Sequence, residues 1–185
     1  MSDDELIIVA NRLPVEAVTD SDGNVTWNVS PGGLVAAVEP SLKGRQGVWI
    51  GWNGRYHDPG EPTMAPIPET AEGRDYRIVE VPLERDDVEQ YYDGFSNAAL
   101  WPLYHDAIAT PTYHRHQFDA YRRVNMLFAQ AAARAAAPGA TVWVHDYQLQ
   151  LVPAMLRSLR PDLRIGFFLH IPFPAPDLFL QLPWR

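Results

Sequence analysis

The sequence predicts an α/β fold in which an open parallel sheet is flanked by helices, and three observations support this prediction. Short apolar runs rich in β-branched residues recur along the chain, as buried strands require. Longer stretches with helical character separate most of these runs. Segments rich in Gly and Pro mark the boundaries between them. Strands that alternate with helices in this way are typical of parallel sheets.

The first half of the chain is expected to begin with a buried central strand, Leu6 to Ala10. The alternation of Val25, Trp27 and Val29 after a turn-like segment predicts a hairpin over residues 15–29. The remaining elements expected in this half are a helix over residues 34–42, a strand over residues 47–52, a Pro-rich loop over residues 57–72 and another strand over residues 77–81.

The second half begins with an aromatic-rich segment, residues 86–104, which is expected to be helical with a break near Gly94. The longest expected helix covers residues 118–137 and is ended by Pro138 and Gly139. A strand over residues 141–145, a helix over residues 149–160 and a second strand over residues 164–169 then form a β-α-β unit. A last element begins but is not completed, over residues 177–185.

Composition narrows the class of protein. A length of 185 residues with 46% hydrophobic content fits one domain with its own core. The sequence has no cysteine, which excludes disulfides, thiolate metal sites and a cysteine nucleophile and fits a cytoplasmic setting. The N-terminus is acidic, and no apolar run approaches the roughly 20 residues of a membrane span. A net charge of −8 is unlike that of a nucleic-acid binder.

Three polar clusters follow expected strands, and ligands of open parallel sheets bind beyond the carboxyl ends of the strands. These clusters are Asn11-Arg12, His145-Asp146-Tyr147 and His170. Arg12 carries a planar cation suited to phosphate oxygens, or it forms a structural ion pair. Asp146 is placed to accept hydrogen bonds from sugar hydroxyls beside the two histidines, or it caps the next helix while the histidines are core groups.

Several other sequence features bear on ligands. Gly32 and Gly33 precede a helix and could let backbone amides approach an anion, although such pairs are most often turns. Neither a dinucleotide fingerprint nor a phosphate-binding P-loop is present, which argues against NAD dehydrogenases and P-loop NTPases. We expect no metal site, because His114 and His116 have no third ligand at a suitable spacing. Pro31 likewise stands where a calcium loop beginning at Asp20 would need its Glu.

An aromatic block in the segment 86–104 could stack on a sugar or pack the core, and core packing is expected for most of its members. The block consists of Tyr91, Tyr92, Phe95, Trp101 and Tyr104.

Taken together, these segments resemble the trehalose-6-phosphate synthases over nearly the whole chain. The order and joint length of the matching motifs make the resemblance specific. The motifs are Val9-Ala10-Asn11-Arg12, Gly32-Gly33-Leu34, Trp49-Ile50-Gly51-Trp52, Tyr91-Tyr92-Asp93-Gly94-Phe95-Ser96-Asn97, Leu100-Trp101-Pro102, Val144-His145-Asp146-Tyr147 and Gly166-Phe167-Phe168-Leu169-His170-Ile171-Pro172-Phe173-Pro174.

The resemblance implies that residues 1–185 form the Rossmann-like, acceptor-binding N-terminal domain of a GT-B glycosyltransferase. It assigns the acceptor, glucose 6-phosphate, to four residues and the donor, UDP-glucose, to three, of which His170 lies beside the transferred glucose. Asp146 and His170 are the residues it implies for catalysis. The acceptor residues are Arg12, Tyr92, Asp146 and Trp101, and the donor residues are Gly32, Gly33 and His170.

The implied reaction is glucosyl transfer with retention, which yields trehalose 6-phosphate and UDP and needs no cofactor. Retention in this family is attributed to front-face attack assisted by the leaving phosphate, so no second catalytic carboxylate is expected. Family members carry a second, nucleotide-sugar domain that we do not find in residues 1–185, so this polypeptide alone is expected to have little or no activity. Alternatives are a transferase with another phosphorylated acceptor and a noncatalytic regulatory subunit. Donor preference and a homo-oligomeric state stay open.

Overall fold

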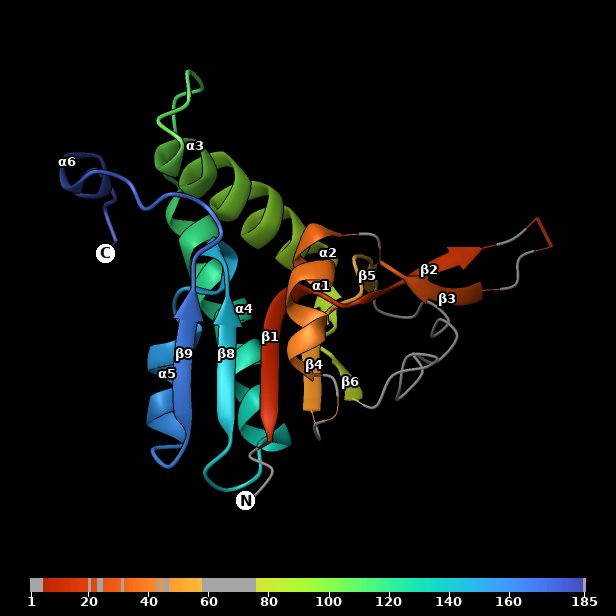
Figure 1. Cartoon of the computed structure of the whole chain (residues 1–185). Coiled ribbons are helices and arrows are strands. Elements are labelled where there is room, and N and C mark those ends of the chain that lie inside the picture. Colours follow the sequence, from red (N-terminus) through yellow and green to blue (C-terminus); the bar gives the residue numbers. More distant parts are fainter. Residues whose placement is uncertain are drawn as a thin grey trace.

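The computed structural model describes residues 5–19, 21–22, 25–30, 32–42, 44, 47–57 and 76–184. A five-stranded sheet forms the centre, and every neighbouring pair in it is parallel, as the sequence predicts. Its order is β6-β4-β1-β8-β9 (Figure 1). The strands are β1 (Leu6–Arg12), β4 (Gly47–Trp52), β6 (Tyr76–Glu80), β8 (Thr141–His145) and β9 (Arg164–Phe168).

The order in which the chain adds strands to the sheet changes direction at β1. From β1 it proceeds outward to β4 and then β6, and it later returns to β8 on the other side of β1 and continues to β9. Leu6 pairs with Gly47 of β4 and with Thr141 of β8, so β1 is hydrogen-bonded on both edges. The place where such a sheet reverses its order is where ligands bind, just beyond the strand ends.

Helices cover both faces of this sheet. Successive residues of β1 point to opposite faces, so Ile7 and Val9 join one core cluster and Ile8 and Ala10 join the other. The larger cluster lies under the helices α4 and α5, and the smaller one lies under α1, on the opposite face (Figure 1). The helical elements are α1 (Gly33–Val38), η1 (Glu39–Leu42), α2 (Arg85–Asp87), η2 (Val88–Leu100), α3 (Trp101–Tyr104), α4 (Arg115–Ala135), η3 (Tyr147–Leu149), α5 (Val152–Leu159) and α6 (Pro176–Phe179).

The helix break expected near Gly94 is wrong. The chain is helical without interruption from α2 through η2 to α3, and the middle part has wide i→i+5 turns in which the amide of Trp101 donates to Ser96. A Cβ atom at position 94 would lie 2.7 Å from Nε2 of Gln117 on α4. Gly94 therefore allows two helices to approach closely and does not end one.

The long helix α4 begins three residues earlier than expected, at Arg115, and ends two residues earlier than expected, at Ala135. Its buried side chains recur at helical spacing, at Tyr121, Val124, Asn125 and Phe128. Beyond the helix, Gly139 adopts a left-handed φ of 75° that reverses the chain into β8.

Smaller elements lie outside the central sheet. The expected hairpin is present as β2 (Val15–Thr19) and β3 (Val25–Val29), which extend away from the body of the molecule (Figure 1). A short parallel pair, which the sequence did not predict, joins β5 (Tyr56–His57) to β7 (Leu83–Glu84). The rest of the expected loop, from residue 58 on, and most of the turn at residues 20–24 lie outside the described residues. No helix within the described ranges is long and apolar enough to cross a membrane.

Candidate functional site

A pocket of about 270 Å³ lies at the point where the sheet order reverses. Arg12 comes to it from the carboxyl end of β1, and His145 and Asp146 come from the end of β8. The start of α1 and the helix η2 complete its walls. The lining residues are Asn11, Arg12, Ser30, Gly32, Gly33, Leu34, Val35, Tyr92, His145, Asp146 and Gln148.

The guanidinium of Arg12 is held in place by packing. Its Cζ lies 5.0 Å from the centre of the Trp52 ring, in a cation–π contact. Gly54 adopts a φ of 89°, and a Cβ atom at that position would overlap Nη2 and Cζ of Arg12. The indole of Trp49 donates to the backbone oxygen of Arg12 at 3.0 Å. The guanidinium is therefore positioned by the ring of Trp52, by the absence of a side chain at Gly54 and by the hydrogen bond that fixes the backbone of Arg12. The side chain of Arg12 stays exposed.

Asp146 occupies an unusual backbone conformation with φ 73° and ψ 170°. This region is essentially reserved for glycine, and side chains held in it are concentrated at functional sites. Its Oδ1 accepts hydrogen bonds from the amides of Tyr147 at 3.0 Å and His170 at 3.2 Å. Since no hydrogen bond to Oδ2 occurs among the described residues, the second carboxylate oxygen is available to a ligand.

A buried polar network supports the turn that follows Asp146. Tyr121 of α4 donates through its hydroxyl to the backbone oxygen of Tyr147 at 2.7 Å. Asn125, one turn further, donates to the backbone oxygens of Tyr121 and Gln148 and accepts from the amide of Leu151. Burial raises the pKa of the Tyr147 hydroxyl to about 12, with smaller contributions from Tyr92 and Asp146. The hydroxyls of this network therefore stay protonated at neutral pH.

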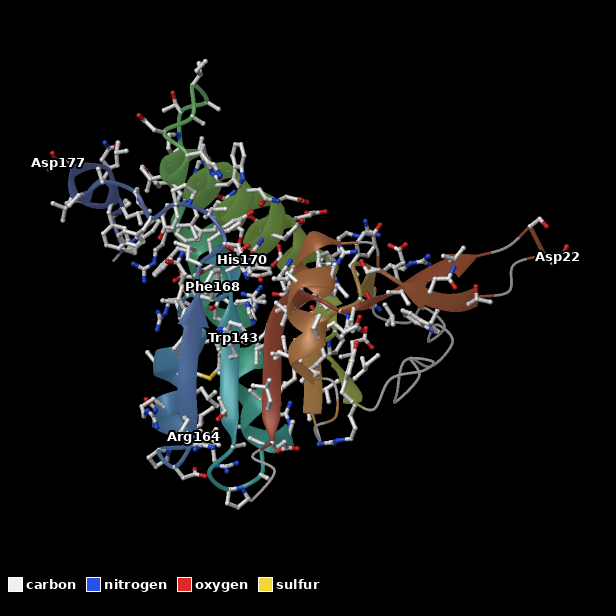
Figure 2. All side chains as sticks on the ribbon, in the orientation of Figure 1. Asp22, Trp143, Arg164, Phe168, His170 and Asp177 are labelled. Atoms are coloured by element: carbon white, nitrogen blue, oxygen red, sulfur yellow. The ribbon has the colours of Figure 1, made fainter. Side chains whose placement is uncertain are left out.

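Two histidines meet beside the pocket. Nδ1 of His145 lies 3.0 Å from Nε2 of His170, and the rings are stacked with centroids 5.2 Å apart. Burial, and secondarily the charge of His170, lower the pKa of His145 to about 4. His145 is accordingly neutral at pH 7. His170 is exposed above Phe168 at the carboxyl end of β9, opposite Arg164 at its amino end (Figure 2).

The fold itself does not require glycine at positions 32 and 33. Gly32 has a φ of −64°, and a Cβ atom there would make only ordinary contacts, the nearest at 3.7 Å from Oγ of Ser30. A Cβ atom at Gly33 would have no atom within 4 Å among the described residues. Both residues line the pocket, so the missing side chains leave room for a ligand at the start of α1.

The aromatic block divides into core and site. Tyr91, Phe95 and Tyr104 are buried, as expected for most of the block. Tyr91 also donates to Oδ1 of Asn11 at 2.7 Å, which ties η2 to the end of β1. Tyr92 lines the pocket and meets the edge of Trp52 at 5.5 Å. Trp101 is 43% exposed and stacks on His105, away from the pocket lining.

The structure thus brings together five of the seven residues singled out from the sequence, which are Arg12, Gly32, Gly33, Tyr92 and Asp146. His170 adjoins them through its bonds to Asp146 and His145, and Trp101 stays apart. Sequence reasoning missed Gln148, which lines the pocket, and Gly54, which shapes it. The Asn-Gly pair just after a strand was a turn signal that could have pointed to Gly54.

No group of three or more possible metal ligands occurs in the part of the chain that the structure describes. The rings of His114 and His116 are stacked with centroids 5.5 Å apart at the start of α4.

Comparison with known proteins is consistent with this arrangement. The model of glycosyltransferase family 20 matches residues 4–185. A trehalose-6-phosphate synthase of Mycolicibacterium gilvum is 59% identical over 181 residues, which are 98% of this chain and 36% of that protein. The chain therefore spans about a third of the length of this relative.

Two solved structures are similar in both sequence and fold. A UDP-forming trehalose-phosphate synthase of Burkholderia xenovorans, in complex with glucose 6-phosphate, is 37% identical with a TM-score of 0.77. An E. coli protein bound with UDP-2-fluoro glucose is 32% identical with a TM-score of 0.78. Each similarity covers 97% of this chain and 36% of the other.

Proposed function

The chain belongs to glycosyltransferase family 20, and from this premise we propose that its pocket binds glucose 6-phosphate as the acceptor of a glucosyl group from UDP-glucose. The products would be trehalose 6-phosphate and UDP. In this proposal residues 1–185 are the acceptor-binding N-terminal domain of a GT-B glycosyltransferase.

One observation carries the proposal: Arg12 and Asp146 reach the same pocket from the ends of two neighbouring strands. A guanidinium presents a planar fork that matches phosphate oxygens, and a carboxylate oxygen accepts hydrogen bonds from sugar hydroxyls. A pocket of about 270 Å³ with a cation on one side and an acceptor on the other suits a small phosphorylated sugar. Tyr92 adds a ring against which the sugar can pack.

The similar structures support the choice of both ligands. The Burkholderia xenovorans protein is in complex with glucose 6-phosphate, and the E. coli protein is bound with UDP-2-fluoro glucose. We extend these ligands to this chain because five of the seven residues that would receive them line one pocket.

On the donor side, we propose that the diphosphate of UDP-glucose approaches Gly32 and Gly33. The first amides of a helix have no partner within it, so they can donate to phosphate oxygens. His170 would lie beside the transferred glucose, since its backbone amide donates to Oδ1 of Asp146 in the pocket.

The chemistry asked of these residues is positioning and charge stabilisation. Front-face attack with retention uses the leaving phosphate to accept the acceptor proton, so the protein need not supply a second carboxylate. Arg12 and Asp146 would fix the acceptor hydroxyl against the donor carbon. Turnover by residues 1–185 alone is expected to be little or none.

We also propose a cytoplasmic location. A sequence without cysteine supports it.

The test is calorimetric titration of the chain with glucose 6-phosphate, glucose and glycerol 3-phosphate. We expect binding of glucose 6-phosphate, weaker binding of the other two, and loss of the preference for phosphate in Arg12→Ala. Asp146→Asn keeps the shape of the side chain and should weaken only the ligands that carry a sugar ring. Equal binding of glycerol 3-phosphate and glucose 6-phosphate would instead favour a different phosphorylated acceptor.

A further inference from the structure

The contact between His145 and His170 must contain one shared proton. Their facing nitrogens are 3.0 Å apart, and two bare or two protonated nitrogens would repel each other at this distance. His145 is fully buried at the end of β8, whereas His170 is exposed beside the pocket. The ring that carries this proton determines whether Nδ1 of His170 can donate a hydrogen bond to a ligand or only accept one.

We propose that His145 is a positioning residue: it donates its Nδ1 proton to Nε2 of His170 and so holds His170 as the Nδ1–H tautomer. The placement of the proton follows from the structure alone. Its consequence for the donor sugar rests on the proposed function.

The direction of the bond follows from the other nitrogen of His145. Nε2 of His145 is buried and has no hydrogen-bond partner within the described ranges. A neutral imidazole carries its proton on one nitrogen only. If Nδ1 of His145 accepted from His170, the proton of His145 would lie on Nε2, which would then be a buried donor without an acceptor. A buried N–H without a partner is less favourable than a buried bare nitrogen without one. The proton therefore belongs on Nδ1.

His145 is kept neutral, so it has only this one proton to give. Burial and the neighbouring ring of His170 lower the pKa of His145 to about 4. The ring of Trp143, centred 4.5 Å away, contributes an apolar neighbour. The nearby carboxylate, Asp146, directs Oδ1 to the backbone amides of Tyr147 and His170.

His170 is thereby fixed at two points. Its amide is bonded to Asp146, and its Nε2 accepts from His145. The remaining nitrogen, Nδ1, then carries a proton that can be donated. In the proposed function, this N–H is the group that His170 offers to an oxygen of the transferred glucose.

The test is to read the tautomer of each histidine from long-range hydrogen–nitrogen correlation spectra of the labelled chain, at about pH 8, where histidines are neutral. We expect a protonated Nδ1 and a bare Nε2 in His170. His105 is an internal reference, because its Nδ1 lies 2.8 Å from the carbonyl oxygen of Trp101 and must donate to it. A protonated Nε2 in His170 of the unaltered chain would overturn the proposal without any variant.

Two substitutions make the cause explicit. His145→Phe fills the space of the ring without a donor, so His170 should change to the Nε2–H tautomer that free histidine prefers, while His105 is unaffected. His145→Asn keeps an N–H close to the place of Nδ1 and should restore the Nδ1–H tautomer. An unchanged His170 in His145→Phe would also contradict the proposal. Because no ligand is added, failure of the proposed function would leave this reading intact.

Discussion

The two sides of the pocket are built by different means. On the β8 side, Asp146 and the turn after it are held by hydrogen bonds to buried side chains and amides. On the β1 side, Arg12 is held by packing against Trp52 and by the open space at Gly54. A carboxylate on a strained backbone needs hydrogen bonds of fixed direction to hold it, whereas a long cationic side chain that stays in water needs only a surface to pack against. Substitutions on the two sides should therefore differ in what they cost.

Asn125→Leu should damage the β8 side most. The substitution removes three hydrogen bonds and leaves the part-buried carbonyl of Gln148 and the part-buried amide of Leu151 without the partner that Asn125 supplies. We expect the free energy of unfolding to fall by about 4 kcal/mol, since each unsatisfied buried group costs about 1–3 kcal/mol. Denaturant unfolding measures it. Asp119→Ala, which removes an exposed ion pair on the same helix, is the control and should change stability by less than about 0.5 kcal/mol.

The β8 side should also respond to pH through His145. Its pKa is about 4 in the folded chain, below the ordinary value of 6.5, so the unfolded chain binds the proton first as the pH falls. Stability from this group is complete well above pH 6.5 and is lost on going down to about pH 4, by about 3 kcal/mol. Unfolding curves between these pH values measure the slope. His145→Phe should flatten it, and a slope unchanged in that variant would show that other groups cause the dependence.

On the β1 side, Gly54→Ala should displace the guanidinium of Arg12. Gly44→Ala is a matched control, because Gly44 has a similar left-handed φ of 70° and nothing within 4 Å among the described residues. We expect Gly54→Ala to cost about 1 kcal/mol more than Gly44→Ala, because only the first adds a clash to the backbone strain. The excess should disappear when Arg12 is also replaced by Ala. An excess that persists there would mean that Arg12 is not what Gly54 accommodates.

The smallest effect has the opposite sign. Gly33→Ala should stabilise the chain by about 0.5 kcal/mol, because alanine favours a helical position and its Cβ meets open space. The same methyl group would occupy the place proposed for the donor diphosphate. Thermal unfolding with and without UDP-glucose tests both statements, and destabilisation without a ligand would show that the glycine serves the fold.

The architecture was predictable because it depends on patterns that are local in the sequence. The apolar run at residues 6–10 is buried from both faces of the sheet, and a run of this kind is visible without knowledge of its neighbours. Even so, Gly94 was assigned as a helix break, because the close approach of Gln117 depends on packing between distant segments.

The site was predictable only in part, and the strand ends explain which part. Arg12 ends β1 and Asp146 follows β8, so the geometry of a parallel sheet brings them together. The supports could not be predicted in this way. Asn125 lies in the middle of a long helix, and nothing local distinguishes it from a solvated residue. The strained φ of Asp146 and the orientation of the ring of His145 are likewise products of tertiary contacts.

Both sides of the pocket should meet one ligand, and amide spectra of the labelled chain during titration with glucose 6-phosphate test this most directly. We expect signals of Arg12 and of Asp146 to Gln148 to shift together with one dissociation constant. In Arg12→Ala, the signals of Asp146 to Gln148 should shift with a much weaker dissociation constant. Shifts confined to one side, two different dissociation constants, or shifts only in residues away from the pocket would contradict a single sugar-phosphate site.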